Sequence, residues 1–98
     1  MNVAILGGLD RLKNNYEKQG RALGFRIRVF SRRVPNMTQR LHDMDGIIIF
    51  TGTVAHPMVE EASRFAKRRG IPVQRSHTSS ISGFKRCLSQ MEAPRRLS

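Results

Sequence analysis

An unbroken apolar run, Ile-Ile-Ile-Phe, occupies residues 47–50 of the chain. The run consists of β-branched and aromatic residues, shows no polar alternation and is too short for a buried helix. Such a run is typical of a strand that is covered on both faces, as in a parallel sheet with helices on either side. The pattern therefore predicts an α/β protein with a buried central strand at residues 46–50.

Three other segments have the patterns of strands. Residues 2–6 are apolar and end at a pair of glycines, whereas residues 25–30 alternate apolar with basic side chains, as an edge strand with one wet face does. Residues 71–73 form a fourth short strand, in which Pro72 favours the opposite edge of the sheet. Right-handed crossovers between parallel strands most simply give the order 2-1-3-4.

Apolar residues recur at helical spacing in the segments that follow these four strands. We therefore expect a three-layer α/β sandwich of Rossmann-like type, with a four-stranded parallel sheet and helices on both faces. Residues 1–91 are expected to form this single domain, and residues 92–98, which lack periodicity, to form a mobile tail. The four apolar stripes are Leu12, Tyr16 and Leu23; Met37, Leu41 and Met44; Met58, Ala62 and Phe65; and Ile81, Phe84, Leu88 and Met91.

The composition adds a strong positive charge to this picture. The chain has 98 residues, with 18 Lys and Arg against 7 Asp and Glu, which gives a net charge of +11. This excess favours anionic partners. The partner is then either nucleic acid or an anionic small molecule, for example a nucleotide. A basic surface with no specific partner is the alternative interpretation. Because the edges of so small a sheet are exposed, we also expect a homodimer.

The cellular location follows from three further features of the sequence. No stretch approaches the ~18 apolar residues that a membrane span requires, so we expect no membrane partner. The N-terminus lacks the pattern of a secretory signal. Cys87 is the single cysteine, which excludes an internal disulfide and fits a reducing compartment. We therefore expect a cytoplasmic protein.

Open α/β sheets bind ligands at the carboxyl edge, and two groups of residues there suit a phosphate. Gly7 and Gly8 follow the first strand, where glycines let the backbone approach a phosphate at the start of the next helix. Arg32 and Arg33 follow the second strand, about twenty residues further on, where basic residues suit a 2′-phosphate. A tight turn without a ligand and a pair of solvated arginines are the competing interpretations.

The segment after the fourth strand supplies a third group. Arg75, Ser79 and Ser80 place a guanidinium and hydroxyls before the last helix, which is the composition of an oxyanion site. Helix capping alone also explains serines at this position. Arg75 favours the interpretation of this segment as a ligand-binding site over helix capping alone.

Two histidines and a carboxylate suggest a metal site. His56 and His77 follow neighbouring strands, and Glu60 lies one helical turn beyond His56, so the three could hold an iron or zinc ion. Alternatively, Pro57 begins the helix and turns His56 away from Glu60, and the histidines are polar neighbours only.

Catalysis is not indicated by these residues. No aspartate ends the central strand and no cysteine follows the first, which excludes phosphoacceptor receiver domains and phosphocysteine enzymes. Of the acidic residues only Asp10 is placed at this carboxyl edge, so no carboxylate pair is available there for acid–base chemistry. The sequence predicts a small non-enzymatic module that binds a phosphate-bearing ligand. The alternatives are a metal-binding sensor and a nucleic-acid-binding protein that uses the basic residues 67–69.

Four segments resemble a known family. They are Gly7-Gly8-Leu9-Asp10-Arg11 with Tyr16, Phe50-Thr51, Val54-Ala55-His56, and Arg75-Ser76-His77-Thr78-Ser79-Ser80. Together they resemble the small bacterial proteins grouped as domain of unknown function twenty-three twenty-five, over nearly the whole chain to about Leu88. The resemblance implies a Rossmann-like cytosolic protein of bacteria and carries no established activity. Pro57 departs from the acidic or polar residue that often follows the histidine in that family.

Overall fold

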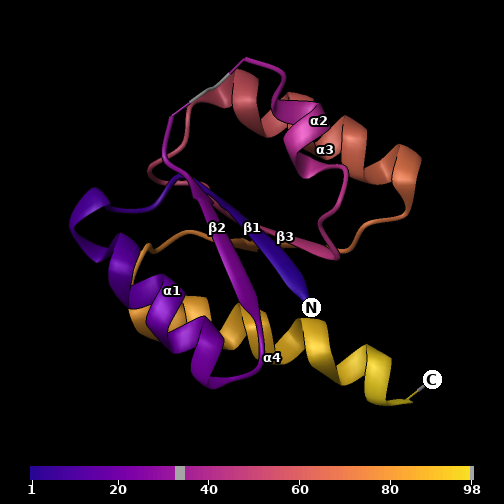
Figure 1. Ribbon diagram of the computed structural model, residues 1–98. Coiled ribbons are helices and arrows are strands. Elements are labelled where there is room, and N and C mark those ends of the chain that lie inside the picture. The colour runs from indigo at the N-terminus through magenta and orange to yellow at the C-terminus, as the bar shows by residue number, and fades with distance from the viewer. Residues whose placement is uncertain (33–34, 98) are drawn as a thin grey trace.

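The computed structural model describes residues 1–32 and 35–97, with side chains described up to Met91 (Figure 1). Four parallel strands form one sheet in the order β2-β1-β3-β4, which confirms the predicted topology. Each strand is followed by a helix, and a short 3-10 helix, η1, precedes the first of them. The elements are β1 (Asn2–Leu6), η1 (Asp10–Leu12), α1 (Lys13–Ala22), β2 (Arg26–Phe30), α2 (Met37–Leu41), β3 (Gly46–Phe50), α3 (His56–Arg69), β4 (Val73–Ser76) and α4 (Ile81–Leu97).

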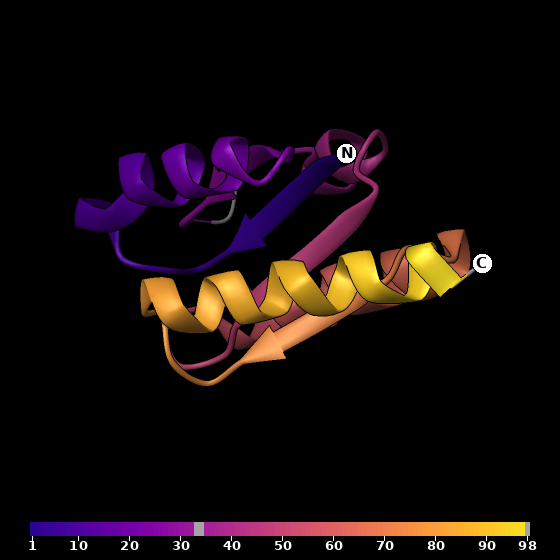
Figure 2. The ribbon, with the colours of Figure 1, turned by 90° about the horizontal axis from the view of Figure 1, so that it is seen from below.

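The sheet is the middle of three layers. Figure 1 shows α1 and α4 on one face and α2 and α3 on the other, and Figure 2 shows α1 and α4 from below. Every residue of β3 is buried, because this strand lies between both helical layers. Ile47 and Ile49 join the core beneath α2 and α3, while Ile48 and Phe50 join the core beneath α1 and α4. Both faces of β3 therefore need apolar side chains, which explains the unbroken run in the sequence.

Strand β2 forms one edge of the sheet, as the alternating pattern predicts. Arg26 and Arg28 are exposed, and they alternate with the partly buried Ile27 and Val29. The guanidinium of Arg28 lies 6.0 Å from the ring centre of Phe30. The basic side chains of this strand thus face solvent on one side of an edge strand.

Strand β4 forms the other edge, but the predicted span of residues 71–73 is wrong. The strand runs over Val73–Ser76, and only its first residue lies in the predicted range. Pairing begins at the carbonyl of Pro72, which accepts a hydrogen bond of 3.0 Å from the backbone N–H of Ile47. Gln74 and Arg75 are polar, yet they continue the ladder, because backbone hydrogen bonds hold an edge strand whose side chains need not be buried.

Helix α4 is longer than its apolar stripe. The helix continues to Leu97, whereas the stripe that predicts it ends at Met91. Residues 92–97 are therefore helical, residue 98 lies outside the described residues, and the mobility of this tail stays a prediction. No helix in the described part of the chain is long and apolar enough to cross a membrane.

Helix α1 approaches the sheet at Gly20, which is buried. A Cβ atom at this position would lie 2.2 Å from Cγ1 of Ile27 in β2 and 3.5 Å from Cζ of Phe84 in α4. The first distance is far below van der Waals contact, so the absence of a side chain sets how closely α1 packs on β2.

Gly20→Ala is expected to lower the free energy of unfolding by about 1–3 kcal/mol, because the added methyl group overpacks the contact with Ile27. Chemical denaturation measures the change. In an Ile27→Ala background, where the clashing atoms are gone, the same substitution is expected to cost much less. An equal cost in both backgrounds would show that the contact does not limit the packing.

Candidate functional site

The carboxyl ends of all four strands meet at one edge of the sheet, since the strands are parallel. At this rim the backbone N–H of Gly8 donates to Oγ1 of Thr53 over 2.7 Å. The same Thr53 oxygen lies 2.9 Å from Oγ of Ser79. Thr53 therefore joins the double glycine to the serine segment, although the two are far apart in the sequence.

The buried side chain of Tyr16 also links the loop after β1 to the loop after β4. Its side chain is fully buried, with the ring centre 5.4 Å from that of Phe50 and 5.3 Å from that of Phe84. Its hydroxyl donates to the carbonyl oxygen of Ser79 over 2.5 Å and accepts a hydrogen bond of 3.3 Å from the N–H of Leu9. The sequence pattern identified Tyr16 as a core residue, and its role as a link between the loops after β1 and β4 carries no separate signal in the sequence.

The glycine amides proposed to bind phosphate have partners within the protein. Gly7 and Gly8 both have positive φ angles, 88° and 89°, which glycine adopts without strain. The N–H of Gly7 donates to the carbonyl of Phe30 over 3.0 Å, and the N–H of Gly8 donates to Thr53. These contacts favour the interpretation of the double glycine as a tight turn.

The serines are also engaged in the fold. Ser79 is 8% exposed and contacts Thr53. Ser80 precedes α4, and its Oγ accepts a hydrogen bond of 3.2 Å from the N–H of Gly83, which is the geometry of an N-cap. Capping and loop packing therefore account for both side chains.

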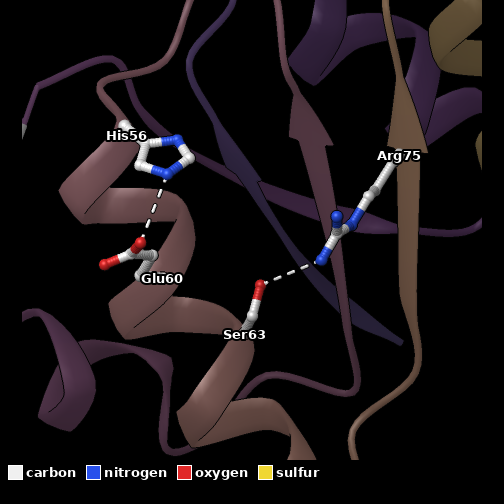
Figure 3. A network of polar contacts seen from close by, with 4 residues as sticks. All are labelled: His56, Glu60, Ser63 and Arg75. Atoms are coloured by element: carbon white, nitrogen blue, oxygen red, sulfur yellow. Dashed lines mark hydrogen bonds and ion pairs between the residues drawn. The ribbon is translucent and has the colours of Figure 1, made fainter.

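Arg75 lies apart from these serines. It pairs in register with Ile49, whose side chain belongs to the core under α2 and α3. Figure 3 shows the guanidinium reaching toward α3, where Nη2 donates to Oγ of Ser63 over 3.3 Å. The serine cap belongs to α4, on the opposite face, so the sheet separates Arg75 from Ser79 and Ser80. Arg32 is exposed after β2, and Arg33 lies outside the described residues.

A depression of about 410 Å³ lies between α3 and the free edge of β4. Ser63 and Lys67 come from α3, Arg75 comes from β4, and Ile71 and Val73 supply the apolar part of the lining. Lys67 and Arg75 are both exposed. The described lining thus combines a guanidinium, an ammonium and a hydroxyl, and contains no carboxylate.

A second depression, of about 660 Å³, lies at the opposite, amino edge of the sheet. Its charged lining residues are Glu17, Arg21 and Arg26, so a carboxylate accompanies the two guanidinium groups. None of the residues predicted to bind a ligand lines this depression. The space between α3 and β4 is therefore the better candidate for an anion.

The predicted metal ligands are brought together only in part. Helix α3 begins at His56, and Nε2 of His56 lies 3.2 Å from Oε1 of Glu60 (Figure 3). Pro57 does not divert the helix, because a proline in the first turn loses no intrahelical hydrogen bond. His77 lies in the exposed loop after β4. Across residues 1–32 and 35–91, no group of three or more His, Cys, Asp or Glu side chains could hold a metal ion.

Cys87 is buried in the core between α4 and the sheet. Burial raises the pKa of its thiol above the ordinary value, and the nearby Arg86 opposes this only in part. A buried, protonated thiol is a poor nucleophile. Cys87 is thus a packing residue.

The model of the DUF2325 family, described as an uncharacterized protein conserved in bacteria, matches residues 2–91. The chain belongs to this family. The match covers all four strands of this DUF2325 protein and extends into α4. No curated protein and no solved structure matches it.

In this DUF2325 protein, Tyr16→Phe is expected to lower the free energy of unfolding by about 1–3 kcal/mol, because the buried carbonyl of Ser79 loses its donor. Chemical denaturation measures the loss. Thr51→Val is the matched control, since it removes an exposed hydroxyl that lies 3.5 Å from the carbonyl of Ser76, and its effect should stay within about 0.5 kcal/mol. Similar losses for both variants would contradict the role assigned to Tyr16.

Proposed function

We propose that this protein binds a phosphate-bearing anion, such as a nucleotide, in the depression between α3 and β4. The observation that carries the proposal is the convergence of Lys67, Arg75 and Ser63 on one depression whose described lining has no carboxylate. Guanidinium and ammonium groups form charge-assisted hydrogen bonds to phosphate oxygens, and a hydroxyl adds a further donor.

The contact between Arg75 and Ser63 supports this proposal. A side chain held by a hydrogen bond loses less conformational freedom when a ligand binds. A guanidinium has five N–H donors in a planar fork, so the bond from Nη2 to Ser63 leaves other donors for a ligand. Arg75 is therefore already turned toward the position that a phosphate would occupy.

Two acidic residues, Glu60 and Glu61, precede Ser63 on α3, and neither belongs to the described lining of the depression. Glu60 lies one turn before Ser63, and its carboxylate is paired with His56 over 3.2 Å. Figure 3 shows this pair directed away from the Arg75 guanidinium. Lys67 and Arg75 are the charged groups of the described lining.

The cellular location and the oligomeric state of the protein are also part of this proposal. We propose a cytoplasmic location, because the single cysteine is a buried thiol that a reducing compartment preserves. We also propose a homodimer formed through an exposed edge strand, β2 or β4. Light scattering of the purified protein measures the mass of the assembly.

Pyrophosphate is a suitable probe for the depression. It should raise the melting temperature of the protein, since a ligand at a hundredfold its Kd stabilises the folded state by about 2.7 kcal/mol. The double variant Lys67→Ala, Arg75→Ala is expected to lose this shift, because both cations of the lining are gone. Differential scanning fluorimetry at fixed ionic strength measures it.

Lys85→Ala with Arg86→Ala is the matched control, because it removes one exposed Lys and one exposed Arg from α4, on the other face of the sheet. This control should retain the shift. An equal loss in the two double variants would mean that pyrophosphate responds to net charge alone, and the proposed site would be wrong.

A further inference from the structure

One segment of the chain carries basic residues without acidic ones, and it begins directly after Glu60 and Glu61 of α3. Residues 62–91 contain no Asp or Glu. This segment includes most of α3, the edge strand β4 and α4 as far as Met91, so it includes both walls of the depression. All acidic residues lie outside it. The seven basic residues within it are Arg64, Lys67, Arg68, Arg69, Arg75, Lys85 and Arg86.

The cations extend beyond the depression along α3. Arg64, Lys67 and Arg68 are exposed, and Arg64 lies three residues before Lys67 and four before Arg68, so it neighbours both on the helix surface. Arg69 is different, because its guanidinium lies 5.6 Å from the ring centre of Phe65 and contacts His42. The available row therefore consists of Arg64, Lys67 and Arg68 with Arg75 beside it, and it continues past the space that a single phosphate would fill.

Aromatic side chains take no part in this surface. The chain has one Tyr, five Phe and no Trp. All six aromatic side chains are buried, and none is more than 6% exposed. A site for a free nucleotide or a single strand ordinarily offers an aromatic ring on which a base stacks. This surface offers charge and a hydroxyl, which recognise a phosphodiester backbone and not a base.

We infer that the phosphate-bearing ligand is the backbone of duplex nucleic acid, bound independently of sequence along the row Arg64, Lys67, Arg68 and Arg75. A duplex presents closely spaced phosphates and keeps its bases stacked, so it requires cations and no stacking platform. The inference rests on the proposed function, since Lys67 and Arg75 are the residues of the depression. It specifies duplex nucleic acid as the ligand and adds Arg64 and Arg68 of α3 to the residues that bind it.

The salt dependence of binding measures the number of phosphates contacted. Four contacts give a slope of about −3.6 in a plot of log K against log salt, or a loss of about 100-fold between 50 and 200 mM salt. In the Lys67→Ala, Arg75→Ala variant two contacts remain, and the loss over the same range should fall to about 10-fold. Fluorescence anisotropy with two short labelled duplexes of unrelated sequence measures both values.

The Lys85→Ala, Arg86→Ala variant is again the control and should keep the slope of the unmodified protein. Arg75→Lys, which preserves the charge, should keep it as well. Tighter binding of a single strand than of a duplex would overturn the inference, as would equal slopes for the two double variants. Binding to phosphatidylserine vesicles without binding to duplexes would overturn it in favour of a membrane surface.

The pyrophosphate experiment separates this inference from the proposed function. If pyrophosphate stabilises the protein through Lys67 and Arg75 but duplexes do not bind at 50 mM salt, the inference fails and the phosphate site stands. If neither ligand binds, both fail. If duplexes bind with the steep slope and pyrophosphate competes for the same residues, both are supported.

Discussion

The complete burial of β3 is the constraint from which the rest of this structure follows. A strand with apolar side chains on both faces is stable only between two layers, so helices must cover both sides of the sheet. Each helix returns the chain to the starting end of the sheet by a right-handed connection, so all four strands are parallel. The carboxyl ends of the strands therefore meet at one edge. The meeting of Gly8, Thr53 and Ser79 at this rim is a consequence of that arrangement.

The sheet brings the loops together at one edge, and it also keeps side chains on its two faces apart. Successive residues of a strand point to opposite faces, so Arg75 faces α3 while the loop that follows β4 leads to α4 on the other side. At the rim, the polar groups of Thr53, Ser79 and Tyr16 bond to one another and to backbone groups. Polar residues at the rim thus fasten the loops, and Lys67 and Arg75, which take no part in these bonds, line the depression between α3 and β4.

The sequence was sufficient to predict the fold because its signals are local and periodic. The apolar run of β3, the alternation of β2 and the stripes of the helices each reflect burial of side chains. The span of β4 was wrong because its polar residues are held by backbone hydrogen bonds, which leave no trace in side-chain chemistry. The shared rim followed from the topology, whereas the face to which Arg75 points depends on where β4 begins. Thr53 carried no signal, since an exposed threonine in a turn looks the same whether or not it joins two loops.

The pairing of the Pro72 carbonyl with Ile47 has a bearing on how members of this family can diverge. It fixes the register of β4, and a slip of one residue in a strand exchanges its two faces. An insertion in the short connection after Gly70 that shifts this pairing by one residue would transfer the guanidinium of position 75 to the side of α4 and bring Gln74 beneath α3. The register of β4, and not only the identity of the basic residue, therefore decides on which face of the sheet this guanidinium lies.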